Sequence, residues 1–147
     1  LLLGCGVPLA AAFGKVDYCR IGCDAGLDFD DKPYMRLLHR ERVSTKNSMG
    51  NTIFRRELSG RAFWNDPDVF FLRSTEIRLT ERQRRDLARV NSLFGGVLFT
   101  SDDLSDYTAE QRALLAQTLR GRPEGPVAVS WAGKQLLVAA GGETTVL

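Results

Sequence analysis

The 147-residue chain has few of the residues on which small disulfide-rich and zinc-binding proteins depend: three cysteines and one histidine, His39. An odd, low number of cysteines does not make the disulfide framework of a small secreted scaffold. Reduced thiols are typical of cytosolic proteins, so we expect a cytoplasmic location and leave an upstream secretory signal open.

Long apolar runs are also absent. No stretch approaches the roughly 20 apolar residues of a membrane span. The first residues, LLLGC, resemble the end of a lipoprotein signal, but a secretory signal needs a charged segment before its apolar one, and none precedes Leu1. Since the chain does not begin with methionine, we expect it to be part of a longer protein whose true termini lie elsewhere.

The chain also lacks a large excess of charge of either sign, because 20 basic residues are offset by 18 acidic ones, for a net charge of +2. The densest basic run, from Arg36 to Arg61, contains one phenylalanine, Phe54, and no series of aromatics interleaved with its basic residues of the kind that stack on nucleic-acid bases. A solvated helical face is favoured there over a nucleic-acid surface. The 44% hydrophobic and 26% charged content is that of a soluble globular protein.

What the chain does have is an alternation of apolar strand-like runs with helix-like segments. Capping-box spacing at Thr80 and Gln83, and again at Thr108 and Gln111, predicts the starts of two helices. Such alternation is typical of βαβ units around a parallel sheet or barrel. The expected strands cover residues 1–9, 15–21, 61–64 and 95–100, and the expected earlier helices cover 33–43 and 47–58.

The pattern changes after Gly121, which is expected to close the last helix. Residues 122–126 are rich in proline and glycine, like a linker. Three short apolar runs follow, over 127–131, 135–139 and 144–147, separated by glycines. We expect them to begin an antiparallel β-domain.

In a strand–helix barrel, functional residues lie just past the carboxyl ends of strands. Three places fit: residues 20–24, 64–68 and 100–103. In the first, Arg20 offers fixed donors for sugar hydroxyls or a carboxylate, and a partly desolvated Asp24 flanked by Asp28 would have a raised pKa suited to a general acid. On spacing alone, a helix cap with a surface ion pair is the favoured alternative.

A metal site competes for the same segment, because Cys19 and Cys23 are followed by several carboxylates. Zinc sites use closer cysteine spacing with further Cys or His ligands, and His39 lies in a basic helical segment. Asp28, Asp30 and Asp31 lack the glycine and distal glutamate of a calcium loop. We therefore expect neither a metal ion nor another cofactor.

The second place is Asn65-Asp66-Pro67-Asp68, with two carboxylates fixed around a proline directly after an apolar strand. They are either pocket residues or turn and cap residues, which is the commoner use of aspartate. Trp64 is either a core residue, which is favoured, or a wall on which a sugar ring stacks.

Four segments together resemble the later half of the catalytic barrel of α-galactosidases, in the clan that includes glycoside hydrolase families 36 and 27. Residues 3–9 (LGCGVPL) resemble the family's fifth barrel strand, and residues 18–24 (YCRIGCD) resemble the sixth, with its Arg-x-x-x-Asp signature. Residues 63–69 (FWNDPDV) and 92–102 (SLFGGVLFTSD) resemble the seventh and eighth. The resemblance covers about residues 1–108, and the tail suits the β-domain that follows the barrel in this family.

The resemblance implies an α/β fold, with residues 1–121 forming the C-terminal half of a (β/α)8 TIM barrel and 122–147 starting an antiparallel β-sandwich domain. It implies a retaining glycosidase that removes terminal α-linked galactose from oligosaccharides, with Asp24 as general acid/base and Arg20 near the 2-hydroxyl of the sugar. The other residues implied to bind substrate are Cys5, Trp64, Asp66 and Asp68, the two aspartates lying at the pocket floor.

The family's nucleophile, an aspartate in a Lys-x-Asp setting, is expected before Leu1, so the chain contains one carboxylate of the pair. Four strands do not close an eight-stranded barrel, and we expect the segment alone to be inactive and to need the N-terminal part of the same barrel as a partner. A catalytically inactive sugar-binding relative and an α-N-acetylgalactosaminidase stay open as alternatives. We expect no nucleic-acid or membrane partner and leave homo-oligomerisation open.

Overall fold

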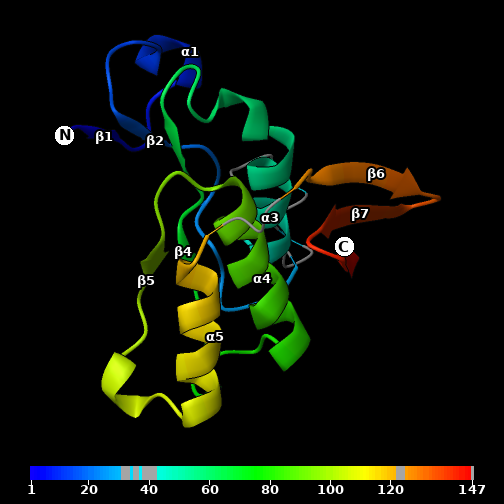
Figure 1. The fold of residues 1–147 in the computed structure, drawn as a ribbon. Helices are drawn as coiled ribbons and strands as arrows, with labels where there is room; N and C mark the ends of the chain where they lie inside the picture. Colours follow the sequence, from blue (N-terminus) through cyan, green and yellow to red (C-terminus); the bar gives the residue numbers. More distant parts are fainter. Residues whose placement is uncertain (31–33, 35–36, 38–42, 122–124, 147) are drawn as a thin grey trace.

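The structure is a computed structural model that describes residues 1–30, 34, 37, 43–121 and 125–146 (Figure 1). It is a mixed α/β arrangement of short parallel strands, helices and a separate antiparallel sheet. The helix expected over residues 33–43 lies almost entirely outside the described residues, as does His39. Within the described part of the chain, no helix is long and apolar enough to cross a membrane.

The five strands of the first 100 residues form two small parallel sheets. One has the order β1-β2-β3, and the other pairs β4 with β5, so the predicted parallel pairing is confirmed. Only Pro67 and Asp68 separate β3 from β4. The strands are β1 (Leu3–Gly4), β2 (Tyr18–Arg20), β3 (Trp64–Asp66), β4 (Val69–Phe70) and β5 (Phe99–Thr100).

The prediction of a buried strand over residues 1–9 is wrong for most of that range. Leu1 and Leu2 are exposed because β1 is the edge of its sheet, and α1 (Leu9–Ala12) starts after Pro8. The strand expected over 61–64 begins only at Trp64, because the chain before it is still turning: the N–H groups of residues 61 and 62 donate to the carbonyl of Leu58.

The buried strand expected over residues 95–100 is also shorter than predicted. β5 contains only Phe99 and Thr100, and Phe99 is exposed. The glycines before it bond elsewhere, since the N–H of Gly95 donates to Asn91 and the N–H of Gly96 donates to the carbonyl of Asn65.

Both predicted capping boxes are confirmed. The Thr80 and Thr108 side chains each accept a hydrogen bond from the backbone N–H of the third residue of their helix, which is a glutamine. The side-chain oxygen of that glutamine accepts a hydrogen bond from the backbone N–H of the threonine. The weaker helix expected over 47–58 is α3, capped by Ser44, and a short 3-10 turn. The helical elements after α1 are α3 (Thr45–Phe54), η1 (Arg56–Leu58), α4 (Glu81–Phe94), η2 (Leu104–Asp106) and α5 (Ala109–Leu119).

The main core lies between α3, α4 and the strands. Leu87 and Val90, spaced on one face of α4, are fully buried, as is Phe70 of β4. A smaller cluster places Cys19 and Phe63 against residues of α1 and η1. Figure 1 shows α4 between α3 and α5, so helices cover one side of the parallel strands.

The antiparallel sheet expected after Gly121 is confirmed. Its strands have the order β6-β7-β8 and lie beside α3 in Figure 1. Arg89 of α4 donates to the carbonyls of Ala140 and Glu143 at the β7–β8 turn, and Trp131 stacks on Phe54 of α3. The strands are β6 (Ala128–Ala132), β7 (Gln135–Ala140) and β8 (Glu143–Val146).

Candidate active site

The candidate site is built at the carboxyl ends of three adjacent parallel strands. The register pairs Gly4 with Cys19 and Arg20 with Asp66, so Cys5, directly after β1, follows the same edge. Because the strands are parallel, side chains from segments far apart in the sequence meet at this edge. The first two places predicted to carry chemistry are therefore neighbours in space.

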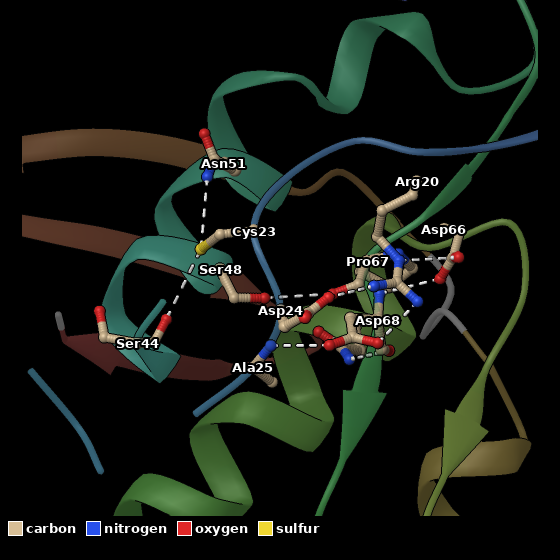
Figure 2. A network of polar contacts seen from close by, with 11 residues as sticks. Arg20, Cys23, Asp24, Ala25, Ser44, Ser48, Asn51, Asp66, Pro67 and Asp68 are labelled. Atoms are coloured by element: carbon tan, nitrogen blue, oxygen red, sulfur yellow. Dashed lines mark hydrogen bonds and ion pairs between the residues drawn. The ribbon is translucent and has the colours of Figure 1, made fainter. Parts of the chain in front are cut away.

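Arg20 is the centre of a cluster with Asp24, Asp66 and Asp68, called here the Arg20 cluster (Figure 2). Its Nε lies 2.9 Å from Asp66 Oδ2 and its Nη2 lies 2.7 Å from Asp68 Oδ1. Its Nη1 lies 2.8 Å from Asp24 Oδ1. Each nitrogen of the planar guanidinium thus faces a different carboxylate, a geometry that lysine does not offer.

Asp24 is the exposed member of this cluster. Its side chain is 70% exposed, whereas the side chain of Asp66 is fully buried. The expectation that Asp24 is partly desolvated is therefore wrong. The Asp28 carboxylate bonds instead to the guanidinium of Arg78, across 50 residues of sequence.

The exposed ion pair between Asp24 and Arg20 is the surface pair favoured from spacing alone, but it is one arm of a larger network. Asp24 directs its second oxygen away from any hydrogen bond or ion pair among the described residues. One oxygen of the Asp24 carboxylate is thus held by a largely buried arginine, and the other is accessible to a ligand.

Burial and charge act in opposite directions on Arg20 and Asp68. Burial alone would lower the pKa of Arg20, but the hydrogen bond and charge of Asp66, with the charge of Asp68, raise it. Burial raises the pKa of the Asp68 carboxyl, against the lowering by the Ala25 N–H and by Arg20. The pKa of Arg20 is thus raised overall, and burial keeps the pKa of Asp68 above its ordinary value despite these partners.

Asp66 uses both carboxylate oxygens within the chain. Oδ2 bonds to Arg20, and Oδ1 accepts a hydrogen bond from the backbone N–H of Asp68 at 2.9 Å. The Asp68 carboxylate in turn accepts from the N–H of Ala25 at 2.7 Å. The two aspartates therefore act as turn and anchoring groups in this structure, and a direct contact with substrate stays a prediction.

Trp64 is not a core residue, and the favoured interpretation of it is wrong. Trp64 is 53% exposed, and the strand register places it level with Tyr18 of β2. Gly96 lies against it: a Cβ at that position would come within 2.6 Å of Trp64 Cβ. Trp64 is thus an exposed aromatic residue two positions before Asp66, and its role as a wall for a sugar ring stays a prediction.

The three thiols differ in exposure: Cys5 is exposed, whereas Cys19 and Cys23 are buried. Burial first, and the charge of Asp66 second, raise the pKa of Cys19 and keep it a thiol. Cys23 Sγ lies 3.9 Å from the carbonyl oxygen of Ser44. Over the described residues, no three His, Cys, Asp or Glu side chains gather in a way that would hold a metal ion.

Two polar residues that the sequence analysis missed support the site from the helices. Ser48 of α3 donates to the carbonyl of Pro67 at 3.2 Å, and Asn91 of α4 donates to the carbonyl of Asp68 at 3.1 Å. Asn91 is fully buried among Leu87, Val90 and Phe94. An asparagine at a core position of an apolar helix face was the available signal, because a buried amide needs a partner.

A cavity of about 840 Å³ lies beside the Arg20 cluster. It is bounded by the end of β2, by α3 and by the β6–β7 hairpin, including the stacked pair Phe54 and Trp131. Of the residues predicted to bind substrate or catalyse, only Arg20 lines it. The cavity and the exposed oxygen of Asp24 are therefore separate features of the same strand end.

No protein-family model matches the chain. The α-galactosidase of Thermus thermophilus in complex with p-nitrophenyl α-D-galactopyranoside matches 97% of the chain at 26% identity, with a TM-score of 0.74. The structural neighbours of this chain are α-galactosidases. The resemblance seen in the four sequence segments is thereby confirmed.

The same α-galactosidase in complex with stachyose matches 80% of the chain at 27% identity, with a TM-score of 0.71. α-Galactosidase I from Mortierella vinacea matches 95% of it at 14% identity and a TM-score of 0.65, which shows a shared fold. The chain spans only 28%, 26% and 38% of the lengths of these three chains, respectively.

Proposed function

We propose that residues 1–121 are the later half of the (β/α)8 barrel of an α-galactosidase and that the antiparallel strands begin its C-terminal β-domain. The observation that carries this proposal is the Arg20 cluster at the carboxyl edge of parallel strands, in a chain 26% identical to an α-galactosidase over 97% of its length. The edge of the sheet and the order of the segments are those expected for barrel strands five to eight.

The uncovered face of the first sheet supports a half-barrel. The register aligns Leu3, Tyr18 and Trp64 across the three strands, and Leu3 and Trp64 are exposed. Their neighbours Gly4 and Cys19 point the other way and are buried. Parallel sheets are normally covered on both faces. We infer that the remaining part of the same barrel, outside residues 1–147, covers this face and pairs with the free edge of β1.

In the proposed reaction, Arg20 binds hydroxyls of a terminal α-linked galactose and Asp24 is the general acid/base. A carboxylate from outside this chain attacks the anomeric carbon while the bond to the leaving oxygen breaks and the proton of Asp24 passes to that oxygen. Water then hydrolyses the glycosyl-enzyme, with Asp24 accepting its proton. This retaining route needs the two carboxyl groups about 5 Å apart, and the exposed oxygen of Asp24 leaves room for that partner.

The test is Asp24→Asn in the intact protein, with Asp106→Asn as the matched control, since Asp106 is an exposed aspartate remote from Arg20 in sequence. We expect Asp24→Asn to lower turnover of an oligosaccharide such as stachyose by about 100- to 10,000-fold while the protein stays folded. The control should match the parent. Unchanged turnover in Asp24→Asn would remove the acid/base assignment. Galactose binding without turnover in the parent protein would identify an inactive sugar-binding relative instead.

A further inference from the structure

Asp24 is poorly fixed by its own side chain, which raises the question of what orients it. The side chain is largely exposed, and among the described residues it forms a single ion pair, with Arg20. A general acid must lie within hydrogen-bond reach of the leaving oxygen, so small displacements reduce its effect. The orientation must therefore come from the backbone around Asp24 and from the guanidinium it contacts.

Both of these supports lead to Asp68. One carboxylate oxygen, Oδ2, accepts from the N–H of Ala25, which belongs to the peptide directly after Asp24. The other, Oδ1, lies 2.7 Å from Nη2 of Arg20, the guanidinium whose Nη1 bonds to Asp24. The contacts close a ring: Asp24 to Arg20, Arg20 to Asp68, Asp68 to Ala25, and Ala25 back to Asp24 (Figure 2).

The backbone of Asp68 is left-handed where it makes these contacts, with φ of 75°. That conformation is unfavourable for a residue with a Cβ, although Asp and Asn adopt it more readily than most. Two hydrogen bonds stabilise it here. The N–H of Asp68 donates to Asp66 Oδ1 at 2.9 Å, and its carbonyl accepts from Asn91 Nδ2 at 3.1 Å.

Asn91 connects this turn to the rigid core. It is fully buried on α4, between side chains that form the main hydrophobic cluster, and its own carbonyl accepts from Gly95 at the helix end. An amide in such a place has little freedom to move. The hydrogen bond from its side-chain nitrogen to the Asp68 carbonyl therefore fixes the turn at Asp68 relative to α4.

We propose that Asn91 and Asp68 are positioning residues for the general acid, with Asn91 fixing the left-handed turn and Asp68 fixing both the peptide after Asp24 and the guanidinium bonded to it. This inference rests on the proposed function. It assigns neither residue a contact with the reacting atoms. It predicts that their loss impairs proton donation more than it impairs sugar binding.

The experiment uses two aryl α-galactosides of similar size with the intact protein, one with a p-nitrophenyl and one with a p-methoxyphenyl leaving group. A p-nitrophenolate leaves without a proton, whereas p-methoxyphenolate needs one, so kcat/KM for the second substrate reports the acid. Asn91→Leu keeps the side-chain shape and removes the donor. We expect it to lower kcat/KM about tenfold or more for the p-methoxyphenyl substrate and less than about threefold for the p-nitrophenyl substrate.

The matched control is Ser92→Ala, which removes a buried hydrogen bond from the next residue of α4 to the carbonyl of Thr118, away from the site. It should change both substrates equally or neither. If Asn91→Leu behaves like this control, the positioning role is overturned. Asp24→Asn is measured in parallel: if it shows the leaving-group difference and Asn91→Leu does not, only the positioning role fails, whereas its absence in Asp24→Asn overturns the acid assignment and the positioning role together.

A second variant keeps the test decisive if Asn91→Leu does not fold. Asp68→Gly keeps the left-handed turn accessible and removes both side-chain contacts. Its control is Glu76→Gly, at an exposed residue with φ of 55°. We expect the leaving-group difference in Asp68→Gly and not in Glu76→Gly, and equal behaviour of the two glycine variants would overturn the proposal.

Discussion

Two groups of polar side chains lie at the carboxyl ends of strands in the two parallel sheets and are built in opposite ways. In the Arg20 cluster, one cation is shared by three carboxylates. In the Asp102 cluster (Arg73, Asp102 and Tyr107), one carboxylate is shared by several donors: Asp102 Oδ2 accepts from two backbone N–H groups, at 2.6 and 2.9 Å, and from the Tyr107 hydroxyl at 2.7 Å.

This difference distinguishes a candidate ligand-binding site from a cluster that stabilises the fold. The side chain of Asp102 is fully buried, so a ligand cannot reach it, although it follows β5 in the third place where the sequence predicted chemistry. Asp24 is exposed, and one of its carboxylate oxygens has no hydrogen-bond or ion-pair partner among the described residues. A carboxylate at a strand end is a candidate for catalysis when its hydrogen bonds and ion pairs leave it accessible to a ligand. It is a structural residue when those partners enclose it.

The largest effect on stability is expected from Arg20→Ala. It leaves Asp66 buried without its cation and brings three carboxylates together with nothing between them. Breaking a buried ion pair by removing one partner costs about 3 to 5 kcal/mol. We expect a loss of that size in the free energy of unfolding of the intact protein in urea.

The same variant has a pH signature. With Arg20 gone, the pKa of Asp68, which burial raises, loses the lowering by the guanidinium and rises further. The folded variant then binds a proton at a higher pH than the unfolded chain, so its deficit shrinks as the pH falls through the raised pKa towards about 4. A deficit that stays constant with pH would show that Arg20 stabilises through packing of its stem rather than through charge.

A smaller effect is expected from Tyr107→Phe in the closed cluster. The variant removes one hydrogen bond to a buried carboxylate, which is worth about 1.5 to 3 kcal/mol. Burial first, and the hydrogen bond to Asp102 second, raise the pKa of Tyr107 above its ordinary value of 10.0. The stabilisation is complete below that value and is lost as the pH rises past it, because only the unfolded tyrosine then gives up its proton. The difference between parent and variant should therefore shrink above about pH 10.

How far the sequence predicts this molecule depends on the distance along the chain over which each interaction acts. The capping boxes at Thr80 and Thr108 join residues three apart, and both were predictable. The ion pair between Arg20 and Asp66 joins residues 46 apart, and it exists only because the strand register places them opposite each other. The segments were found by resemblance, but nothing local indicated that Arg20 contacts three carboxylates.

The same reasoning explains the errors. Trp64 and Leu1 belong to apolar runs that would be buried if the uncovered face and the edge of β1 were covered, and in this chain they are exposed. Asp24 was expected to be partly desolvated and flanked by Asp28, but its side chain is exposed and the Asp28 carboxylate accepts from Arg78, 50 residues away. Local pattern gives the elements, whereas the partners of charged side chains follow from how those elements are placed.

The smallest effect on stability is expected from Asp24→Ala. The side chain is exposed and forms one ion pair with Arg20, which keeps Asp66 and Asp68 as partners, so the free energy of unfolding should change by no more than about 0.5 kcal/mol. Urea unfolding of Asp24→Ala beside Arg20→Ala measures the contrast directly. A loss for Asp24→Ala as large as that for Arg20→Ala would make Asp24 a structural member of the cluster, equivalent to Asp102. A negligible loss combined with a collapse of turnover would identify Asp24 as the one carboxylate of the cluster whose position serves a ligand rather than the fold.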